Sequence, residues 1–478
     1  MTAQAQPELP FPGQRRAWWL REALAAEQPS PLAPSLFGDV SADVAIVGGG
    51  YTGMWTAYFL GEIAPGTRIV LLEEDICGGG PSGRNGGFLH GWWEYLPYLA
   101  KRYGPAEGLR IAAAADEVVS GIGEWCERHR VDAWFTPKGY LRVNAFPKVA
   151  DDWGGSIADL ERLGAPGQLV HVDREAVQQR CASPAFGNGV LMPSAATVQP
   201  ALLARGLRRV LLERGVQIHE GTGVQRIERH AGGVRMATAR GSVTADRGVL
   251  AVNAWAAGWP GFRTRVLAWG SYIVLTEPIP QRLAALGWTG GEAIADSRFT
   301  ISYFRTTQDG RIAFGAGVGA AGFGGRIGQV FTHDRHAIER VVANFRHLFP
   351  MLADIRFEDA WGGPIDITAD RFPEIGSHLG GRVLYAHGFA GNGVGPARLA
   401  GRILAARLAG RADPLATLPL FDRRQRFLPP EPFRSIGARA IREALIRQDD
   451  ALDAGRRPGL LTQLVARVPS LLGYRFRH

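Results

Sequence analysis

The sequence predicts an α/β protein, in which a Rossmann-type nucleotide-binding domain is interleaved with a second domain built on a mixed sheet. Three glycine-rich loops lead to this prediction, at residues 48–53, 78–87 and 388–395. The segments between them alternate between helical and strand periodicity, as is typical of α/β architecture. The chain ends in a basic tail that reads as helical. With 478 residues, it can form two or three domains with substantial cores.

The first glycine loop joins a strand to a helix within residues 43–73. Gly48, Gly50 and Gly53 form a G-x-G-x-x-G fingerprint directly after the run Asp-Val-Ala-Ile-Val. The first glycine allows a tight turn, the second lets a diphosphate approach the backbone, and the third lets the helix pack on the sheet. The helix N-terminus then presents its unpaired N–H groups to the phosphates.

Two acidic residues end this unit. Glu73 follows Gly53 by 20 residues, where it can accept hydrogen bonds from an adenosine ribose. Glu74 disfavours a 2′-phosphate and argues against NADP. A fingerprint alone is weak support in a chain with 63 glycines, but the strand, the helix and the acid are the context that the motif requires. The unit therefore predicts a bound dinucleotide, either NAD or FAD.

The remaining elements follow from apolar spacing and turn residues. Helices are expected at 18–25, 105–129, 198–213, 335–349 and 396–408. Strands are expected at 140–143, 170–172, 215–219, 223–227, 249–255, 271–275, 300–304, 311–314 and 382–387. We expect an N-terminal arm (1–40), a discontinuous nucleotide-binding domain (41–100, 190–262 and 375–415), a discontinuous substrate domain (101–189 and 263–374) and a basic tail (416–478).

The composition is that of a globular protein, with 46% hydrophobic and 21% charged residues. No apolar run reaches the length of a membrane span, so no integral membrane segment is expected. Arg15 and Arg16 are similar to a twin-arginine signal, but no apolar segment follows them. The three cysteines have neither metal-ligand nor redox spacing. We therefore expect a cytoplasmic protein without a bound metal.

The net charge of +9 is concentrated in the segment after residue 421. A nucleic-acid surface is one interpretation, but no interleaved aromatic residues or nucleic-acid motif support it. A solvated or subunit-contacting surface is favoured, and the chain can form a homo-oligomer. The amphipathic stretch 460–472 can lie on a membrane or on a partner, although packing on the protein's own body is favoured.

Four segments resemble one known family: residues 43–53, 81–87, 361–368 and 388–395 with the following helix. Together they identify the chain as similar to D-amino-acid-oxidase-like FAD-dependent oxidoreductases, nearest to gamma-glutamylputrescine oxidoreductase-like amine oxidases. The resemblance spans about residues 15 to 475. It implies hydride transfer from a C–N bond of a small amine or amino acid to flavin N5. The resulting imine would give an aldehyde or oxo acid, with oxygen as the acceptor.

The resemblance and the glycine loops define the expected FAD site. Arg84 can make charge-assisted contacts to the diphosphate and the flavin edge. The helix after the third loop directs its positive end towards the flavin, where it would favour the anionic reduced form. No cysteine lies near the third loop, so noncovalent FAD is expected. The expected cofactor-binding residues are Gly48, Gly50, Tyr51, Thr52, Gly53, Glu73, Glu74, Ser82, Arg84, Asn85, Gly86, Gly87, Val224, Asn253, Gly388, Gly391, Asn392, Gly393 and Val394.

Four residues are candidates for the catalytic face: His90, Tyr303, Arg305 and Trp361. Tyr303 and Arg305 alternate on one strand and therefore share a face. Arg305 can clamp a substrate carboxylate or form an ordinary ion pair. Trp361 can be a pocket wall or a core residue, and a lone histidine such as His90 is often structural. Arg371 can bind substrate or only shape a turn.

Other functions fit the same sequence features. A flavin-binding protein with another acceptor, such as a quinone, or with a non-amine role would carry the same loops. A pathway partner and a 2-hydroxy acid dehydrogenase-like enzyme are examples. An NAD-linked dehydrogenase fits less well, because it does not need the third glycine loop and its returning helix.

Overall fold

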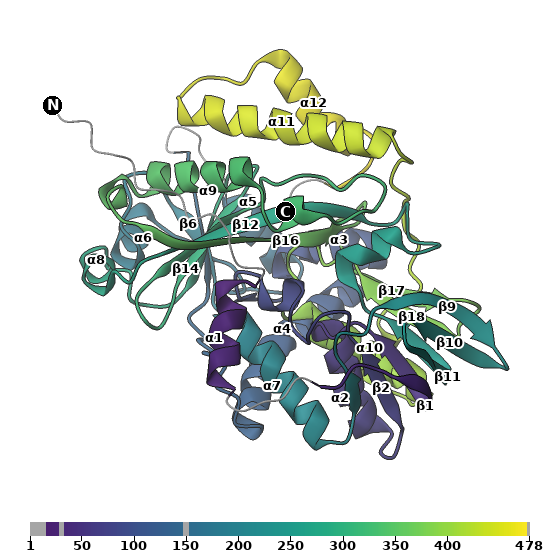
Figure 1. The fold of residues 1–478 in the computed structure, drawn as a ribbon. Coiled ribbons are helices and arrows are strands. Elements are labelled where there is room, and N and C mark those ends of the chain that lie inside the picture. Colours follow the sequence, from purple (N-terminus) through teal and green to yellow (C-terminus); the bar gives the residue numbers. More distant parts are fainter. Residues whose placement is uncertain (1–15, 28–32, 147–152, 476–478) are drawn as a thin grey trace.

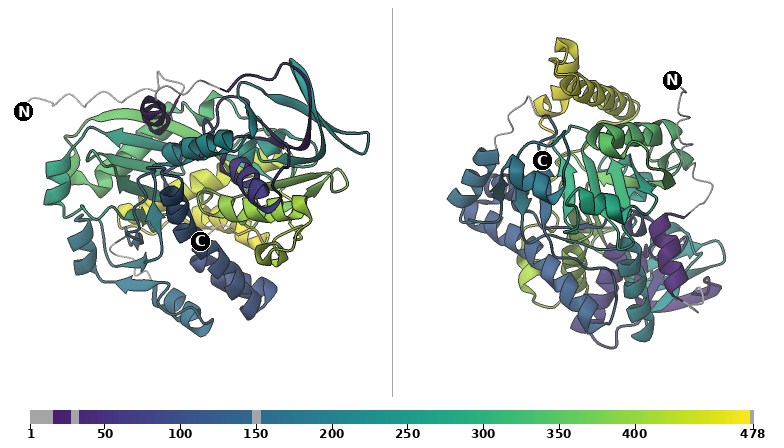
Figure 2. Two further views of the ribbon diagram at one scale, coloured as in Figure 1. Left: turned by 90° about the horizontal axis from the view of Figure 1, so that it is seen from below. Right: turned by 90° about the vertical axis from the view of Figure 1, so that its left-hand side faces the viewer.

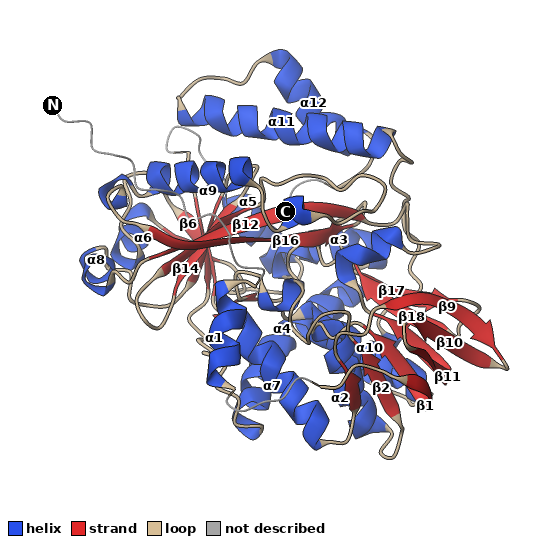
Figure 3. Ribbon diagram, in the orientation of Figure 1, coloured by secondary structure: helices blue, strands red, loops and turns tan. Residues whose placement is uncertain are grey.

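The computed structural model describes residues 16–27, 33–146 and 153–475, and two eight-stranded sheets form its centre (Figures 1 and 3). Of the expected arm, residues 1–15, which include Arg15, and residues 28–32 lie outside the described part. The first sheet has the order β17-β18-β11-β1-β2-β8, and β10 and β9 extend it from β11. These strands are β1 (Gly38–Val47), β2 (Ile69–Leu72), β8 (Gln217–His219), β9 (Val224–His230), β10 (Gly233–Thr238), β11 (Gly241–Leu250), β17 (Glu374–His378) and β18 (Val383–His387).

The central strands of the first sheet run parallel: β18, β11, β1, β2 and β8. Such strands are buried on both faces, which explains the uninterrupted burial of Ile69–Leu72 and Val383–His387. The helices packed against this sheet and against one another are α2 (Tyr51–Ile63), α4 (Pro105–Arg128), α7 (Pro200–Glu213) and α10 (Pro396–Ala409). Because the ends of β1, β2 and β18 meet at one edge, the loops that follow them converge there.

The second sheet has the order β16-β12-β15-β14-β13-β4-β6-β5 and is mixed, because β13 and β4 are parallel while the other pairs are antiparallel. Its strands are β4 (Tyr140–Val143), β5 (Val170–Val172), β6 (Gly189–Met192), β12 (Leu267–Thr276), β13 (Ala293–Asp296), β14 (Ser302–Thr306), β15 (Ile312–Ala316) and β16 (Phe357–Ile367). A small ribbon of β3 (Phe88–Leu89) and β7 (Ala196–Thr197) is separate from both sheets.

Helix α9 (Arg335–Leu348) packs on β12 and β15 of the second sheet. Phe345 of this helix packs against Phe314, which in turn stacks on Phe304 in the core. The shorter helices are α1 (Trp18–Ala26), α3 (Leu96–Tyr103), α5 (Trp153–Arg162), α6 (Arg174–Arg180) and α8 (Pro280–Ala285). The 3₁₀ turns are η1 (Pro81–Gly83), η2 (Trp93–Tyr95), η3 (Asn253–Gly258), η4 (Gln329–Phe331), η5 (Pro350–Leu352) and η6 (Pro414–Thr417).

The chain ends in two further helices, α11 (Phe433–Asp453) and α12 (Leu460–Leu471), which we call the tail hairpin. The hairpin lies over the second sheet, at the end of the molecule away from α2 and α7 (Figures 1 and 2). Within the part of the chain that the structure describes, no helix is both long and apolar enough to cross a bilayer.

Most expected elements agree with the observed ones. The helices expected at 335–349 and 396–408, for example, end within one residue of α9 and α10. The strand expected at 249–255 is wrong, because β11 ends at Leu250 and residues 253–258 form the turn η3. Strand β6 differs from the expected domain plan, because Gly189–Met192 pairs with β4 in the second sheet although residue 190 was assigned to the nucleotide-binding domain. Helix α4 was assigned to the substrate domain, yet Trp125 packs its ring against Trp55 of α2 at 5.1 Å.

A buried charge network joins α7 to the first sheet. Glu220, which follows β8, accepts hydrogen bonds from Arg208 at 2.9 Å and from Arg205 at 3.1 Å. Its carboxylate also accepts from the backbone N–H groups of Ala33 and Cys77. Burial alone would raise the pKa of Glu220, but these donors hold it below its usual value. The carboxylate thus fixes three segments that are distant in sequence.

We predict that Glu220→Gln destabilises the protein by about 3–5 kcal/mol, because it leaves buried guanidinium groups without their counter-charge. The free energy of unfolding from urea titration measures this loss. Since the pKa of Glu220 is lowered in the fold, its contribution is present above pH 4.5 and is lost as the pH falls through the folded value, so the difference should shrink in acid. Glu213→Gln is the control, because its pair with Arg209 is exposed and worth only about 0.5 kcal/mol. Equal stability of the two variants would contradict the prediction.

Candidate functional site

The three fingerprint glycines have different physical roles. Gly48 has φ +107°, and a Cβ there would overlap the Ala251 carbonyl oxygen in the segment after β11. A Cβ on Gly53 would overlap the Gly48 carbonyl oxygen. Gly50 has an ordinary φ of −83°, and a Cβ there would approach only the Ser82 hydroxyl, at 3.1 Å. The packing of the protein therefore requires Gly48 and Gly53, whereas the space beside Gly50 is left for a ligand.

The two acids at the end of β2 lie beside this turn. Glu73 accepts hydrogen bonds from the N–H of Gly49 at 2.7 Å and of Asp75 at 2.9 Å, one on each carboxylate oxygen. Burial raises the pKa of Glu73 to about 7. Each oxygen keeps a further lone pair for a ribose hydroxyl. Glu74 lies beside Gly223, the residue before Val224.

The second glycine loop is attached to the first. The Ser82 hydroxyl accepts a hydrogen bond from the Tyr51 N–H at 2.9 Å, at the start of α2. Asn85, expected to contact the cofactor, braces the loop itself. Its amide donates to the carbonyls of Pro81 and Ser82, and its oxygen accepts from the Gly87 N–H at 2.7 Å. Asn85 therefore holds the conformation of the loop, and it also borders the cavity described below.

Arg84 turns its side chain back along the same loop. Its Nε donates to the Gly79 carbonyl at 2.8 Å, and Nη1 lies 3.4 Å from the Gly362 carbonyl. Burial lowers the pKa of Arg84 below its ordinary value. The Trp361 indole donates to the Arg84 carbonyl at 2.8 Å and so ties β16 to the loop.

Asp366 holds the third glycine loop in place. Its carboxylate accepts a hydrogen bond from the Gly388 N–H at 2.6 Å, and its carbonyl accepts from the Ala390 N–H at 3.0 Å. Gly388 has φ +84°, and a Cβ there would overlap Thr368. Burial raises the pKa of Asp366 to about 7. The sequence motif at 361–368 includes this aspartate, but no local pattern indicates that it contacts residue 388.

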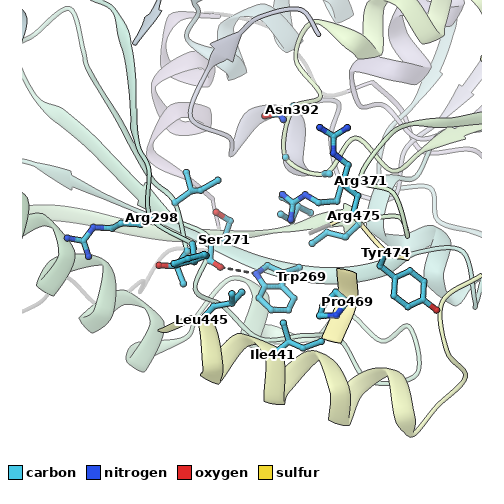
Figure 4. A pocket seen from close by; sticks show the side chains of 18 of the residues that line it. Trp269, Ser271, Arg298, Arg371, Asn392, Ile441, Leu445, Pro469, Tyr474 and Arg475 are labelled. Atoms are coloured by element: carbon cyan, nitrogen blue, oxygen red, sulfur yellow. Dashed lines mark hydrogen bonds between the residues drawn. The ribbon is translucent and has the colours of Figure 1, made fainter. Parts of the chain in front are cut away.

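One cavity of about 1260 Å³ opens where these loops meet. Its walls include residues of the second loop, residues of the third loop and side chains of the second sheet (Figure 4). The lining residues used below are Arg84, Asn85, Gly86, His90, Trp269, Ser271, Tyr303, Arg371, Gly391, Asn392, Val394 and Arg475.

The glycine loops and the cavity together fit a dinucleotide whose ring system lies in the cavity. The open space beside Gly50 leads from the first turn towards the second loop, whose residues border the cavity. Asn253, with φ +48°, follows β11, and its side chain lies beside Asp366. Within the described residues its buried Oδ1 accepts no hydrogen bond. A buried amide oxygen of this kind is costly unless a ligand or water satisfies it. The Gly48–Gly53 turn, Asn253 and the 388–395 loop would hold FAD.

Two of the four catalytic candidates border the cavity. The Tyr303 hydroxyl is 2.8 Å from Ser271 Oγ, and a Cβ on Gly86 would lie 3.1 Å from the Tyr303 ring. Burial raises the pKa of Tyr303 to about 12, so its hydroxyl stays protonated. His90 is buried, shares a hydrogen bond with the Gly91 carbonyl and stacks on Tyr140 at 5.0 Å.

The other two candidates are not part of the cavity wall formed by the described residues. Arg305 lies on the same strand face as Tyr303, as expected, but donates to the Val198 carbonyl and lies over the Trp19 ring at 5.9 Å. Burial lowers its pKa to about 9. Trp361 packs edge-on against Trp19 at 6.1 Å. Helix α1 covers both side chains. The structure therefore does not place Arg305 as a carboxylate clamp, and it does not place Trp361 as a wall of the pocket.

The cavity also contains groups that the sequence did not reveal. Ser271 and Trp269 come from β12, and the Trp269 indole donates to the Gly317 carbonyl at 2.9 Å. Arg475 comes from the end of the tail. Alternation along β12 could have indicated Ser271, but no sequence pattern indicates that residue 475 returns to this place.

We predict that Asp366→Asn changes how stability depends on pH. Because the folded pKa of Asp366 is about 7 and its ordinary value is 3.8, its contribution to stability is full below pH 3.8 and is lost as the pH rises through 7. The isosteric amide has no such titration. Melting temperatures of the two proteins between pH 5 and 9 should therefore diverge in favour of the variant up to about pH 7, and the difference should then level off. A constant difference over this range would contradict the raised pKa.

Comparison with known proteins places this site in a family. The sequence model of the family described as FAD dependent oxidoreductase matches residues 43–407. The chain is 31% identical over 391 residues to the probable oxidoreductase OrdL of Rhizobium meliloti, covering 81% of this chain and 88% of that protein. It is 30% identical over 393 residues to the gamma-glutamylputrescine oxidoreductase of Escherichia coli, covering 80% and 87%.

Solved structures share the fold. The glycine oxidase of Geobacillus kaustophilus superposes with a TM-score of 0.64 at 20% identity, covering 81% of this chain and all (100%) of that one. The L-amino acid deaminase of Proteus vulgaris gives a TM-score of 0.64 at 17% identity, covering 86% and 98%. The family match spans all three glycine loops and both sheets. The chain therefore belongs to the family of FAD-dependent oxidoreductases.

Proposed function

We propose that this protein oxidises a C–N bond of a small amine or amino acid. The observation that carries this proposal is the cavity at which the second and third glycine loops meet Ser271 and Tyr303 of the second sheet. FAD, when bound, would accept the hydride from the carbon at N5 and pass two electrons to oxygen, giving peroxide. The substrate would leave as an imine, and water would convert it to an aldehyde or oxo acid and an amine.

The residues of the cavity support binding and orientation of a neutral amine. With its pKa at about 12, the Tyr303 hydroxyl can donate a hydrogen bond to the substrate or accept one from it, but it is a poor base near neutral pH. Glu94, a cavity-lining acid, is bound to Arg142 at 2.6 Å. An amine that arrives unprotonated loses hydride without a protein base, so these side chains need only hold the reacting carbon in place.

The names of two relatives also support a substrate with a C–N bond. The gamma-glutamylputrescine oxidoreductase and the glycine oxidase are named for compounds that contain a C–N bond. We infer the same class of substrate for this chain, without naming a particular amine. Noncovalent FAD, oxygen as acceptor and a location in the cytoplasm belong to the same proposal.

The purified protein should be yellow, and anaerobic addition of a suitable amine should bleach its visible absorbance. The panel comprises glutamylputrescine, sarcosine, glycine and aminoalkylphosphonates. Air should restore the colour with one peroxide per substrate oxidised. A 2-hydroxy acid is tested in parallel with the amines. If the protein is yellow but no amine bleaches it, the protein is better explained as a flavin-binding protein with another role.

We predict that Gly50→Val yields folded protein with greatly weakened FAD binding. The backbone at Gly50 accepts any residue, and the nearest protein atom to a new Cβ is a serine hydroxyl, so the fold should tolerate the change while the diphosphate loses its space. Circular dichroism checks the fold, and fluorescence titration with FAD measures affinity. Gly61→Val is the matched control, because Gly61 lies in the helix that follows Gly50 and a Cβ there meets nothing within 4 Å. Normal FAD affinity in Gly50→Val would show that the cofactor lies elsewhere.

A further inference from the structure

The second helix of the tail hairpin exposes a row of leucines to solvent. Four leucines of α12 and the leucine that caps its end have exposed fractions between 57% and 86%; they are Leu460, Leu461, Leu464, Leu471 and Leu472. We call these five residues the leucine face. Single exposed leucines are common, but a contiguous group of them marks an interaction surface. The expected packing of residues 460–472 on the protein's own body is therefore wrong for these side chains.

The five leucines share one side of the helix. At about 100° per residue, Leu460, Leu464 and Leu471 project within about 40° of one another, and the other two lie next to them. Pro469 projects from the opposite side and is buried. Helix α12 packs on α11, so it turns one side to the protein and the leucine face to the solvent.

The leucine face lies at an outer end of the molecule. The tail hairpin lies over the second sheet, away from α2 and α7 (Figures 1 and 2). Phe427, which is 59% exposed, adds an aromatic ring near the end of α12. The neighbouring Arg426 donates to the Leu472 carbonyl at 3.1 Å, and the Tyr474 hydroxyl donates to the Phe427 carbonyl at 3.2 Å. An apolar surface in this place can meet a flat partner.

Buried polar contacts fix the hairpin to the second sheet. Asp449 is fully buried and accepts hydrogen bonds from the Thr300 hydroxyl at 2.6 Å and from the Phe299 N–H at 3.0 Å. Asp453 pairs with Arg298 at 2.6 Å. Such contacts are strong because their groups are shielded from water. Whatever binds the leucine face is therefore attached to the body of the protein and not to a loose tail.

The charged side chains around the leucine face are positive. After Asp453, the rest of the chain contains five arginines and no aspartate or glutamate. Arg456 and Arg457 are exposed just before α12, and Arg467 is exposed within it. By the same helical geometry, Arg467 projects about 20° from Leu460, at the edge of the leucine face. The partner that complements this surface is apolar inside and negatively charged outside, as an anionic bilayer is.

A second copy of this chain complements the surface less well. In a twofold contact the leucine face would meet itself, and the arginines beside it would also face each other and repel. The helix has 12 residues, which gives a footprint of about 18 Å by about 10 Å. Each side of a stable protein interface contributes about 800 Å², which is well above this footprint.

We propose that the leucine face and the arginines beside it dock the protein on the surface of a membrane that contains anionic phospholipids. Helix α12 lies in the plane of the interface in this arrangement, because a bilayer span needs about 20 residues. The leucines enter the boundary between headgroups and acyl chains, and Arg456, Arg457 and Arg467 meet the lipid phosphates. Docking of this kind does not depend on the reaction in the cavity.

Flotation of the purified holoenzyme with lipid vesicles tests the docking. One set of vesicles contains phosphatidylcholine alone, and the other contains equal parts of phosphatidylcholine and phosphatidylglycerol. We expect the protein to float with the mixed vesicles and to bind pure phosphatidylcholine at least about tenfold more weakly, because each arginine near an anionic surface contributes about fivefold in affinity. Added salt should weaken binding to the mixed vesicles, because it screens the charges.

Substitutions on the surface separate the two contributions. The double variant Leu460→Ser, Leu464→Ser should weaken binding to the mixed vesicles by at least about tenfold, because two side chains no longer leave water. Arg456→Gln with Arg457→Gln should weaken it by about tenfold to thirtyfold. Leu212→Ser is the matched control, because this leucine is also exposed on a helix but lies on α7. All of these side chains are on the surface, and circular dichroism confirms that the variants fold.

The other possible occupants of the leucine face give different results. Wild-type holoenzyme that binds neither kind of vesicle, or the double leucine variant floating as well as the wild type, would overturn the proposal. Sedimentation velocity then identifies the occupant. A dimer that the double leucine variant dissociates would show that the face joins two copies of the chain, and a monomer that ignores vesicles would indicate a protein partner instead of a membrane.

Discussion

The whole site depends on how closely backbones approach one another at the end of β1. The Gly48 carbonyl lies so near Gly53 that any side chain at residue 53 would overlap it, and Gly48 itself is pressed against Ala251 of the neighbouring chain segment. These contacts bring the start of α2 directly onto the first sheet. Because the loops after β1, β2 and β18 all leave the same edge, this turn lies beside the other two loops.

The second and third loops are held by side chains that reach across the fold. Ser82 bonds to the start of α2, and Asp366 reaches from β16 to the Gly388 N–H. Asp366 belongs to the second sheet, whereas Gly388 follows a strand of the first. This buried carboxylate thereby joins a strand of the second sheet to a loop of the first, and the cavity lies near this contact. Its raised pKa reflects the cost of burying a charge for this purpose.

Charge is distributed unevenly between the two sides of the cavity. The hydroxyls of Ser271 and Tyr303 form a neutral, hydrogen-bonding side. Arg371 and Arg475 form a cationic side, which the tail completes. The exposed leucines on the outer surface of α12, such as Leu460 and Leu461, play no part in this wall. The basic tail that the sequence left without a role thus contributes one guanidinium directly to the site.

The sequence by itself determined the fold class, the extents of most helices and strands, and the FAD-dependent character of the protein. These depend on local features: apolar periodicity, turn residues, and a glycine fingerprint whose parts lie within 26 residues, from Gly48 to Glu73. Only the tertiary structure decided which side chains border the cavity. Arg305 has the right strand face, yet α1 covers it. Asp366 and Arg475 entered the site through contacts with residues 22 and 106 positions away, Gly388 and Ala369. Contacts over such separations depend on how sheets and helices pack, and local sequence patterns carry no record of that packing.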